Sequence, residues 1–256
     1  MEDWIKNIIA LISGGALWEG FKFLYPEIKR PIDNYGKAKK QLYENLDPIL
    51  KASDELYGKI VSLMKEDFST FINEKHSISD DVEQNKRYIY YLFAQFWAQL
   101  EYIRMKSHYF SIARIKKGNE LLRFIETYES REFRILDRSI QRIIGEALLE
   151  ESGNVFKVMS LNQFVNKLQD ENSNIKKWIV LLENKLNSSS DKEVRQEILV
   201  FGVLVAILID HFDPNHKIVR KREIYLNKLS EKSKNTIRRN LLGHYLKFVR
   251  NKEEYY

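Results

Sequence analysis

Residues that break helices are scarce in this chain. Only 4 prolines and 10 glycines occur among 256 residues, and long stretches are rich in Leu, Ile, Lys and Glu. These residue types favour helices, and no strand-turn-strand pattern stands out. The sequence therefore predicts an all-α protein folded as a multi-helix bundle. Hydrophobic residues make up 44% and aromatic residues 12% of the chain, so a sizeable core can be buried.

Apolar periodicity locates the expected helices. Residues 88–102 are aromatic on almost every side, which is typical of a helix at the centre of a bundle. The uncharged run 198–209 is too short to span a bilayer and predicts a second buried helix. Residues 124–140 are expected to be irregular. Further helices are expected over residues 48–74 after an Asp47-Pro48 start, over 161–186, and over 231–251 with Ser230 as the cap.

The N-terminal segment, residues 4–25, predicts a hydrophobic helix that Pro26 and Pro31 end. Its uncharged stretch covers only residues 7–18, which is shorter than the roughly 20 apolar residues that an isolated span prefers. Three interpretations stay open. The segment can anchor the protein in a membrane or build a membrane-inserted oligomer, it can lie in the membrane interface, or it can be buried in the core or a dimer.

The charges around this segment predict an orientation. Glu2 and Asp3 precede it, whereas basic residues follow it, so the body of a membrane-attached protein would lie in the cytoplasm, at the inner face of the membrane. We divide the chain into a membrane-anchor or oligomerisation helix over 1–26, a helical region with the aromatic core helix over 27–153, and a basic helical region over 154–256.

Several chemistries are disfavoured by what the sequence lacks. It has no cysteine, which removes disulfides, thiolate zinc sites and cysteine nucleophiles. Glycine-rich phosphate loops and the Gly-x-Ser-x-Gly elbow are also absent from the sequence, so ATPases, dinucleotide enzymes and serine hydrolases are disfavoured. Two Asp and two His lie between residues 210 and 216, but Pro214 makes a turn the simplest explanation. We therefore expect no metal and no cofactor.

The chain is basic, with a formal net charge of +6, and the excess is concentrated near the C-terminus. Such clusters attract polyanions, although a solvated helix face balanced by acidic residues elsewhere is the alternative. If the polyanion is RNA, the candidate binding residues are Lys232, Lys234, Arg238 and Lys247.

One short motif lies within this basic stretch: Arg239-Asn240-x-x-x-His244. At α-helical spacing, Asn240 and His244 lie next to each other on the border of an apolar stripe, with Arg239 toward the other flank. RNA cleavage needs a base for the 2′-hydroxyl proton, an acid for the leaving oxygen and a cation for the phosphate. His244 can act as acid or base, Arg239 as the cation and Asn240 as an orienting amide. The alternative is a packed histidine with the other two side chains in solvent.

The motif resembles the signature of HEPN ribonucleases, helical-bundle domains that cut RNA in bacterial toxin and antiviral systems. The resemblance covers six residues and the all-α context. It implies a metal-independent endoribonuclease whose Arg and His act at a dimer interface. The hydrophobic N-terminus is also similar to that of small membrane-anchored HEPN accessory proteins of some CRISPR systems.

Together these features predict an RNA-binding, HEPN-like effector of a phage-defence or toxin system. It would act as a homodimer or higher homo-oligomer, with a defence-system protein as a further candidate partner. The alternative is a non-enzymatic, membrane-associated oligomeric effector or scaffold that perturbs the membrane.

Overall fold

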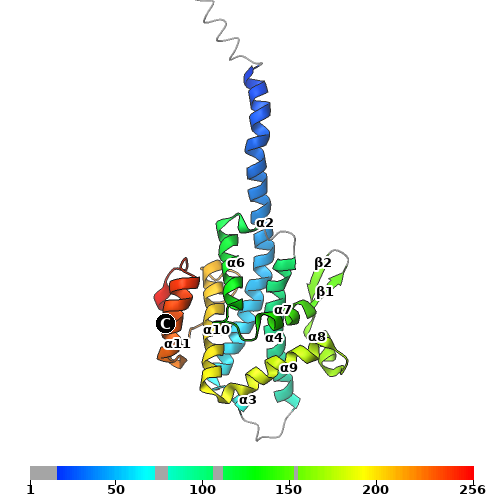
Figure 1. Ribbon diagram of the computed structural model, residues 1–256, viewed down its shortest axis with the longest axis vertical. Coiled ribbons are helices and arrows are strands. Elements are labelled where there is room, and N and C mark those ends of the chain that lie inside the picture. Colours follow the sequence, from blue (N-terminus) through cyan, green and yellow to red (C-terminus); the bar gives the residue numbers. More distant parts are fainter. Residues whose placement is uncertain (1–15, 73–79, 106–111, 153–154) are drawn as a thin grey trace, which may run out of the picture.

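The computed structural model describes residues 16–72, 80–105, 112–152 and 155–256. Almost all of the regular structure is helical, so the prediction of an all-α bundle is confirmed (Figure 1). The elements, in chain order, are α2 (Ala16–Lys65), α3 (Ser69–Ile72), α4 (Asp80–Met105), α6 (Lys116–Glu129), α7 (Arg138–Ala147), β1 (Leu149–Ser152), β2 (Val155–Val158), α8 (Leu161–Gln169), α9 (Asn174–Asn187), η1 (Ser188–Ser190), α10 (Lys192–Phe212), η2 (Leu226–Lys228), α11 (Glu231–Thr236), η3 (Ile237–Tyr245) and η4 (Lys252–Tyr255).

Helix α2 corrects the predicted helix boundaries. It continues without interruption past Pro26, Pro31 and Pro48, so the predictions that the first two end a helix and that the third begins one are wrong. A proline inside a helix costs about 3 kcal/mol through a lost hydrogen bond and a steric clash. Around Pro48, the complete burial of Ile49 and Leu50 in the core offsets that cost. The N-terminal part of α2 projects beyond the helical body (Figure 1).

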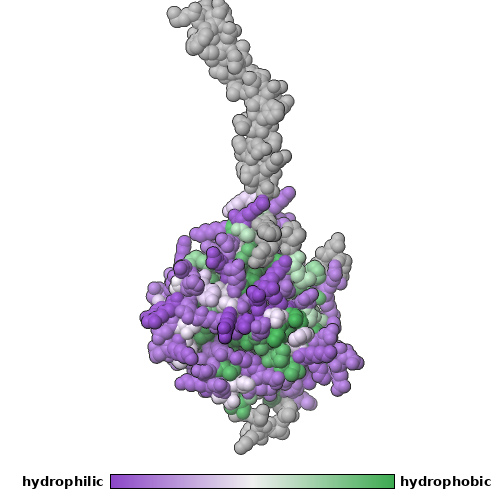
Figure 2. Space-filling model, viewed as in Figure 1, coloured by the Kyte–Doolittle hydropathy of each residue, from purple (hydrophilic) through white to green (hydrophobic). Residues whose placement is uncertain are grey.

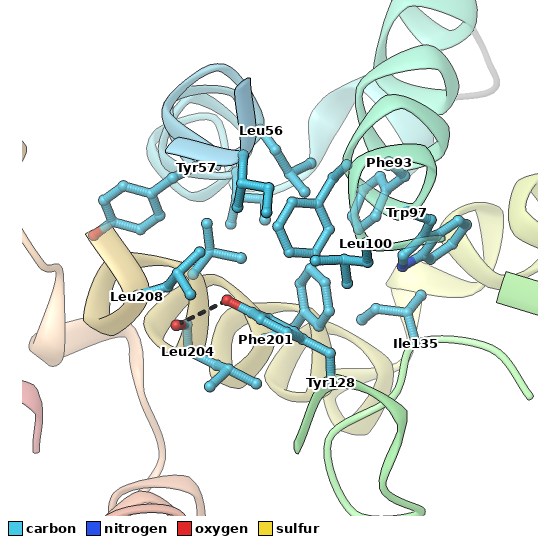
Figure 3. Close-up of a cluster of buried hydrophobic side chains, with 14 of the residues drawn as sticks. Leu56, Tyr57, Phe93, Trp97, Leu100, Tyr128, Ile135, Phe201, Leu204 and Leu208 are labelled. Carbon is cyan, nitrogen blue, oxygen red and sulfur yellow. Dashed lines mark hydrogen bonds between the residues drawn. The ribbon is translucent and has the colours of Figure 1, made fainter. Parts of the chain in front are cut away.

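The hydrophobic core forms where α4 and α10 meet α2 and α6. At its centre the rings of Phe96, Tyr128 and Phe201 contact one another with centroids 4.9 to 6.0 Å apart. Figure 3 shows Tyr128 and Phe201 among the buried side chains of this core. The Tyr128 hydroxyl donates a hydrogen bond to the Leu204 carbonyl at 3.1 Å. Every residue from 198 to 209 is buried. The two buried helices predicted from the sequence are thus confirmed.

Helices α4 and α7 approach each other closely at Gly145. A Cβ atom placed on Gly145 would lie 2.7 Å from the Trp97 carbonyl oxygen, so only glycine fits against the α4 backbone here. This contact fixes α7, and with it the loop that connects α6 to α7, against the centre of the bundle.

A two-stranded hairpin was not predicted from the sequence, and neither was α6 as a separate helix. Strands β1 and β2 pair antiparallel, with Leu149 opposite Val158. The signal was present: Gly153-Asn154, between two short runs, is a dipeptide typical of tight hairpin turns.

Two other boundaries differ from expectation. The predicted irregular stretch 124–140 includes the last turns of α6, whose Phe124 and Tyr128 are completely buried. The single helix expected over 161–186 is two helices, α8 and α9, separated by a turn in which Ser173 N–H donates to the Asp170 carbonyl.

Residues 1–15, most of the predicted hydrophobic helix, lie outside the described residues. Within the described ranges, no helix combines the length and apolar character that crossing a bilayer requires. Most of the visible face of the body is hydrophilic (Figure 2). One core runs from Ala38 to Tyr255 and is shared by the predicted regions 27–153 and 154–256, whose boundaries stay predictions.

Candidate functional site

The motif lies on a π-helix, not on the α-helix that the sequence analysis assumed. Helix α11 ends at Thr236, and η3 continues as a π-helix, in which backbone N–H groups donate to carbonyls five residues earlier. The N–H of Leu246 donates to the Leu241 carbonyl at 2.7 Å in this pattern. Residues five apart therefore lie on the same side of adjacent turns, and Arg239 and His244 share a face.

The burial pattern matches this wider turn. Ile237, Leu241, Leu242 and Leu246 are all completely buried, and they form two pairs spaced by five residues. Arg239 and His244 are a third such pair and are both exposed. The π-register thus lets two consecutive leucines enter the core while the arginine and the histidine face outward together.

His244 lines a groove between η3 and α6. The groove has a volume of about 700 Å³, and we call it the histidine groove. Three cationic side chains line it with His244, namely Lys116, Arg123 and Lys247, and so do two carboxylates. All three cations are exposed. Next to His244, the ring of Tyr245 lies edge-on to the imidazole with centroids 5.1 Å apart.

One of the carboxylates, Glu120, is bound to a second histidine. Its Oε2 lies 2.9 Å from Nε2 of His211, and both side chains are largely buried, 12% and 15% exposed. The rings of Phe124 and Phe248 pack against His211 with centroids 5.7 and 5.2 Å away. The pair carries two full charges only when the imidazole is protonated. Helix α6 thus presents a fixed carboxylate in the groove that His244 lines.

The other two motif residues lie outside the histidine groove. Nδ2 of Asn240 donates a hydrogen bond to Oε1 of Glu132, which ties η3 to the loop between α6 and α7. Arg239 is exposed, and it forms no ion pair with any residue in the described part of the chain. Arg123 on α6 lines the groove with His244, so it can take the phosphate-stabilising role that was predicted for Arg239.

The predicted RNA-binding residues divide into two groups. Lys247 lines the histidine groove. The other three have local partners: Lys232 with Glu193 at 3.3 Å, Lys234 with Glu231 at 2.9 Å, and Arg238 with the Asn235 side chain at 3.2 Å. Exposed pairs of this kind contribute at most about 1 kcal/mol, so phosphate oxygens can replace these partners at little cost.

The Asp and His residues between 210 and 216 have structural partners. Asp213 accepts hydrogen bonds from the backbone N–H groups of Lys217, Ile218 and Val219 at 2.8, 2.8 and 3.0 Å. Burial alone would raise the pKa of Asp213, but these hydrogen bonds outweigh it and lower the pKa below its usual value. Among the described residues, no group of three potential ligands is arranged around a metal position.

Asp210 binds the C-terminal end of the chain. Its Oδ2 accepts a hydrogen bond from the Tyr255 hydroxyl at 2.8 Å, and Oδ1 lies 3.4 Å from Nε2 of His216. Burial raises the pKa of the Asp210 carboxyl, against the opposing effect of the Tyr255 hydrogen bond. The side chains that suggested a metal site from the sequence thus hold the turn after α10 and the short helix η4.

Comparison with known proteins adds no assignment. Searches with protein-family models, against curated proteins and against solved structures found no match to this chain.

Sequence reasoning did not find the α6 side of the groove. Lys116, Glu120 and Arg123 lie more than 120 residues before His244, and no motif links them to it. Their spacing on one helix face, at i, i+4 and i+7, was the only signal available.

Proposed function

We propose that the protein is an RNA-binding effector with metal-independent endoribonuclease activity of the HEPN type, and that His244 acts on the RNA. One observation carries the proposal: His244 is exposed in a groove with three cations and a fixed carboxylate. An exposed imidazole has access to a phosphodiester, and the cations favour the negatively charged strand.

The chemistry follows from these groups. A base takes the proton of a 2′-hydroxyl, and the 2′-oxygen attacks the adjacent phosphorus. The bond from phosphorus to the 5′-oxygen breaks, an acid protonates that oxygen, and a 2′,3′-cyclic phosphate remains. His244 serves as base or acid, and Glu120 is our candidate for the opposite role. Arg123 stabilises the charge that develops on the phosphate.

The resemblance to HEPN ribonucleases adds a second copy. In that arrangement two motifs face each other, and the exposed pair of Arg239 and His244 on one face of η3 supports it. Arg239 of one protomer would then supply a cation at the groove of the other. RNA is the proposed substrate, and a homodimer or higher homo-oligomer is the proposed active form.

The test uses a labelled single-stranded RNA with EDTA present. We expect His244→Ala to lower the cleavage rate at least about 100-fold while the protein stays folded, because a general acid or base contributes 10²- to 10⁴-fold. Glu120→Gln should lower it at least about 10-fold. Arg250→Ala is the control, since Arg250 is exposed near the motif but does not line the groove. Equal rates for His244→Ala and Arg250→Ala would remove the nuclease proposal.

A second candidate rests on the projecting helix. The N-terminal part of α2 extends beyond the body (Figure 1), and exposed Lys37, Lys39 and Lys40 lie along it. This arrangement supports a membrane-associated oligomeric effector whose body lies at the cytoplasmic face. The double substitution Ile9→Asp and Ile12→Asp should then abolish pelleting with anionic vesicles and abolish toxicity, while His244→Ala leaves both unchanged. If His244→Ala abolishes toxicity and the double isoleucine substitution leaves it unchanged, the nuclease is favoured.

A further inference from the structure

Four arginines gather beside the start of α7, away from the motif. Arg131, Arg134, Arg138 and Arg142 line one hollow of about 630 Å³, which we call the arginine hollow. Two carboxylates, Glu129 and Asp137, are the acidic residues that line it. Four guanidinium groups facing two carboxylates leave the hollow with an excess of positive charge.

Both carboxylates are already engaged inside the protein. Glu129 is shared by two arginines: Arg104 lies 2.6 Å from its Oε1, and Arg142 binds both of its oxygens at 2.8 and 2.9 Å. Asp137 caps α7 by accepting a hydrogen bond from the Ser139 N–H at 3.0 Å. The hydrogen bond from the Ser139 hydroxyl, together with the one from its N–H, lowers the pKa of Asp137. Asp137 therefore stays charged at neutral pH, where it pairs with Arg134 and also attracts Arg138.

Two of the arginines lack such a partner. Arg131 and Arg138 are exposed, and neither forms an ion pair with a carboxylate of the described residues. Arg134 is bound to Asp137 at 3.0 Å, and Arg142 is held by Glu129. The hollow thus combines two guanidinium groups held in ion pairs with two that form none, of which Arg138 acts on Asp137 only through its charge. Guanidinium groups match phosphate oxygens in geometry and charge, so this arrangement favours a phosphate-bearing ligand.

The loop between α6 and α7 connects the arginine hollow to the histidine groove. Arg131 and Arg134 of this loop line the hollow. The two residues between them contact η3: Glu132 accepts the hydrogen bond from Asn240, and the ring of Phe133 lies edge-on to Tyr245 with centroids 5.4 Å apart. An RNA strand bound in the histidine groove can therefore continue across this loop into the arginine hollow.

We infer that the arginine hollow is a second phosphate-binding site for single-stranded RNA, which contacts the backbone of the strand whose scissile bond lies at His244. This inference rests on the proposed function for its substrate, but it concerns binding and not cleavage. Arg131 and Arg138 are its principal contacts. The hollow binds the phosphates of the RNA backbone and does not distinguish between bases.

The experiment measures the binding of a fluorescein-labelled 12-nucleotide RNA by anisotropy over a range of salt concentrations. It uses full-length protein carrying His244→Ala and a probe whose 2′-hydroxyls are replaced by 2′-methoxy groups, so that the probe stays intact even if His244 is not the residue that acts on RNA. Adding Arg131→Gln and Arg138→Gln should weaken binding about 10-fold at 0.15 M salt. Loss of two phosphate contacts should also make the slope of log K against log salt shallower by about 1.4, since single strands give roughly 0.7 per contact.

A charge-matched control separates this effect from the loss of net charge. Lys167→Gln and Lys177→Gln remove the same two charges from exposed positions that line neither the hollow nor the groove. We expect this pair to weaken binding less than about 2-fold. If the arginine pair behaves like the lysine pair, or if the parent protein does not bind the RNA, the inference is overturned.

The outcomes also separate this site from the catalytic proposal. If His244→Ala cleaves RNA at the wild-type rate and the arginine pair still lowers affinity and slope, the hollow stands and the role of His244 fails. If His244→Ala abolishes cleavage while the arginine pair matches its lysine control, the role of His244 stands and the hollow fails.

Discussion

Asp213 should be one of the most important single side chains for the stability of the C-terminal third. Substitution by Ala removes three hydrogen bonds to backbone N–H groups. Val219 is 7% exposed, so its N–H loses its partner in a buried setting, which costs about 2 kcal/mol. Lys217 and Ile218 are exposed and can turn to water, so each adds about 0.5 kcal/mol. We expect Asp213→Ala to lower the free energy of unfolding by about 3 kcal/mol.

Urea denaturation measures this loss. With a slope of about 3 kcal/mol per molar urea, the midpoint should fall by about 1 M. Asp213→Asn keeps one acceptor oxygen and should lose about half as much. A midpoint for Asp213→Ala within about 0.2 M of the wild type would refute the reasoning, because the three hydrogen bonds would then contribute almost nothing.

The same variants give a pH dependence with a definite sign. The pKa of Asp213 is lowered in the folded protein, so its charge stabilises the fold above the unfolded pKa of about 3.9. That stabilisation is lost as the pH falls through the folded pKa. The stability gap between wild type and Asp213→Asn should therefore shrink as the pH falls from 5 to 3. A gap that is constant or grows would contradict the charge of Asp213 as the cause.

Two further substitutions test the packing. Tyr128→Phe removes the buried hydrogen bond to the Leu204 carbonyl and should lower the free energy of unfolding by about 1 kcal/mol, seen as a fall in Tm of about 2–4 °C; an unchanged Tm would contradict it. Gly145→Val forces side-chain atoms against the Trp97 carbonyl and should cost at least about 2 kcal/mol in urea denaturation. Its control is Gly36→Ala, where a Cβ meets nothing within 4 Å, so equal effects of the two would refute the close contact of α4 and α7.

Local features of the sequence explain which predictions are confirmed. Residues 198–209 carry no charge, so any folded structure must bury them, and α10 was predicted on that basis. Ser230 was predicted as a cap, and its hydroxyl does accept from the Ser233 N–H. Composition and apolar periodicity are local properties of the sequence. They are sufficient to predict helices that are almost completely buried.

The errors have equally physical causes. Pro48 was read as a helix start because a proline normally disfavours the helix interior, but tertiary packing around it determined the outcome. The motif was placed on an α-helix because a period of 3.6 is the default. The structure has a π-helix here instead, and this changes which side chains share a face.

Only the η3 side of the candidate site could be predicted from the sequence. His244 was expected at the border of the buried stripe, and it is exposed there. Glu120 and Arg123 could not be found, because they meet His244 through the packing of α6 on η3, a contact across more than 120 residues. Arg131 and Arg138 are far from any recognisable motif, and their grouping appears only once α7 is placed.

The most direct test of the role of His244 is the cleavage of RNA and of a matched strand without 2′-hydroxyls, both in EDTA. Because the 2′-oxygen is the proposed nucleophile, we predict that wild-type protein cuts the RNA to products ending in 2′,3′-cyclic phosphate, leaves the deoxy strand intact, and that His244→Ala cuts neither. Cleavage of the deoxy strand, or undiminished cleavage of RNA by His244→Ala, would contradict it.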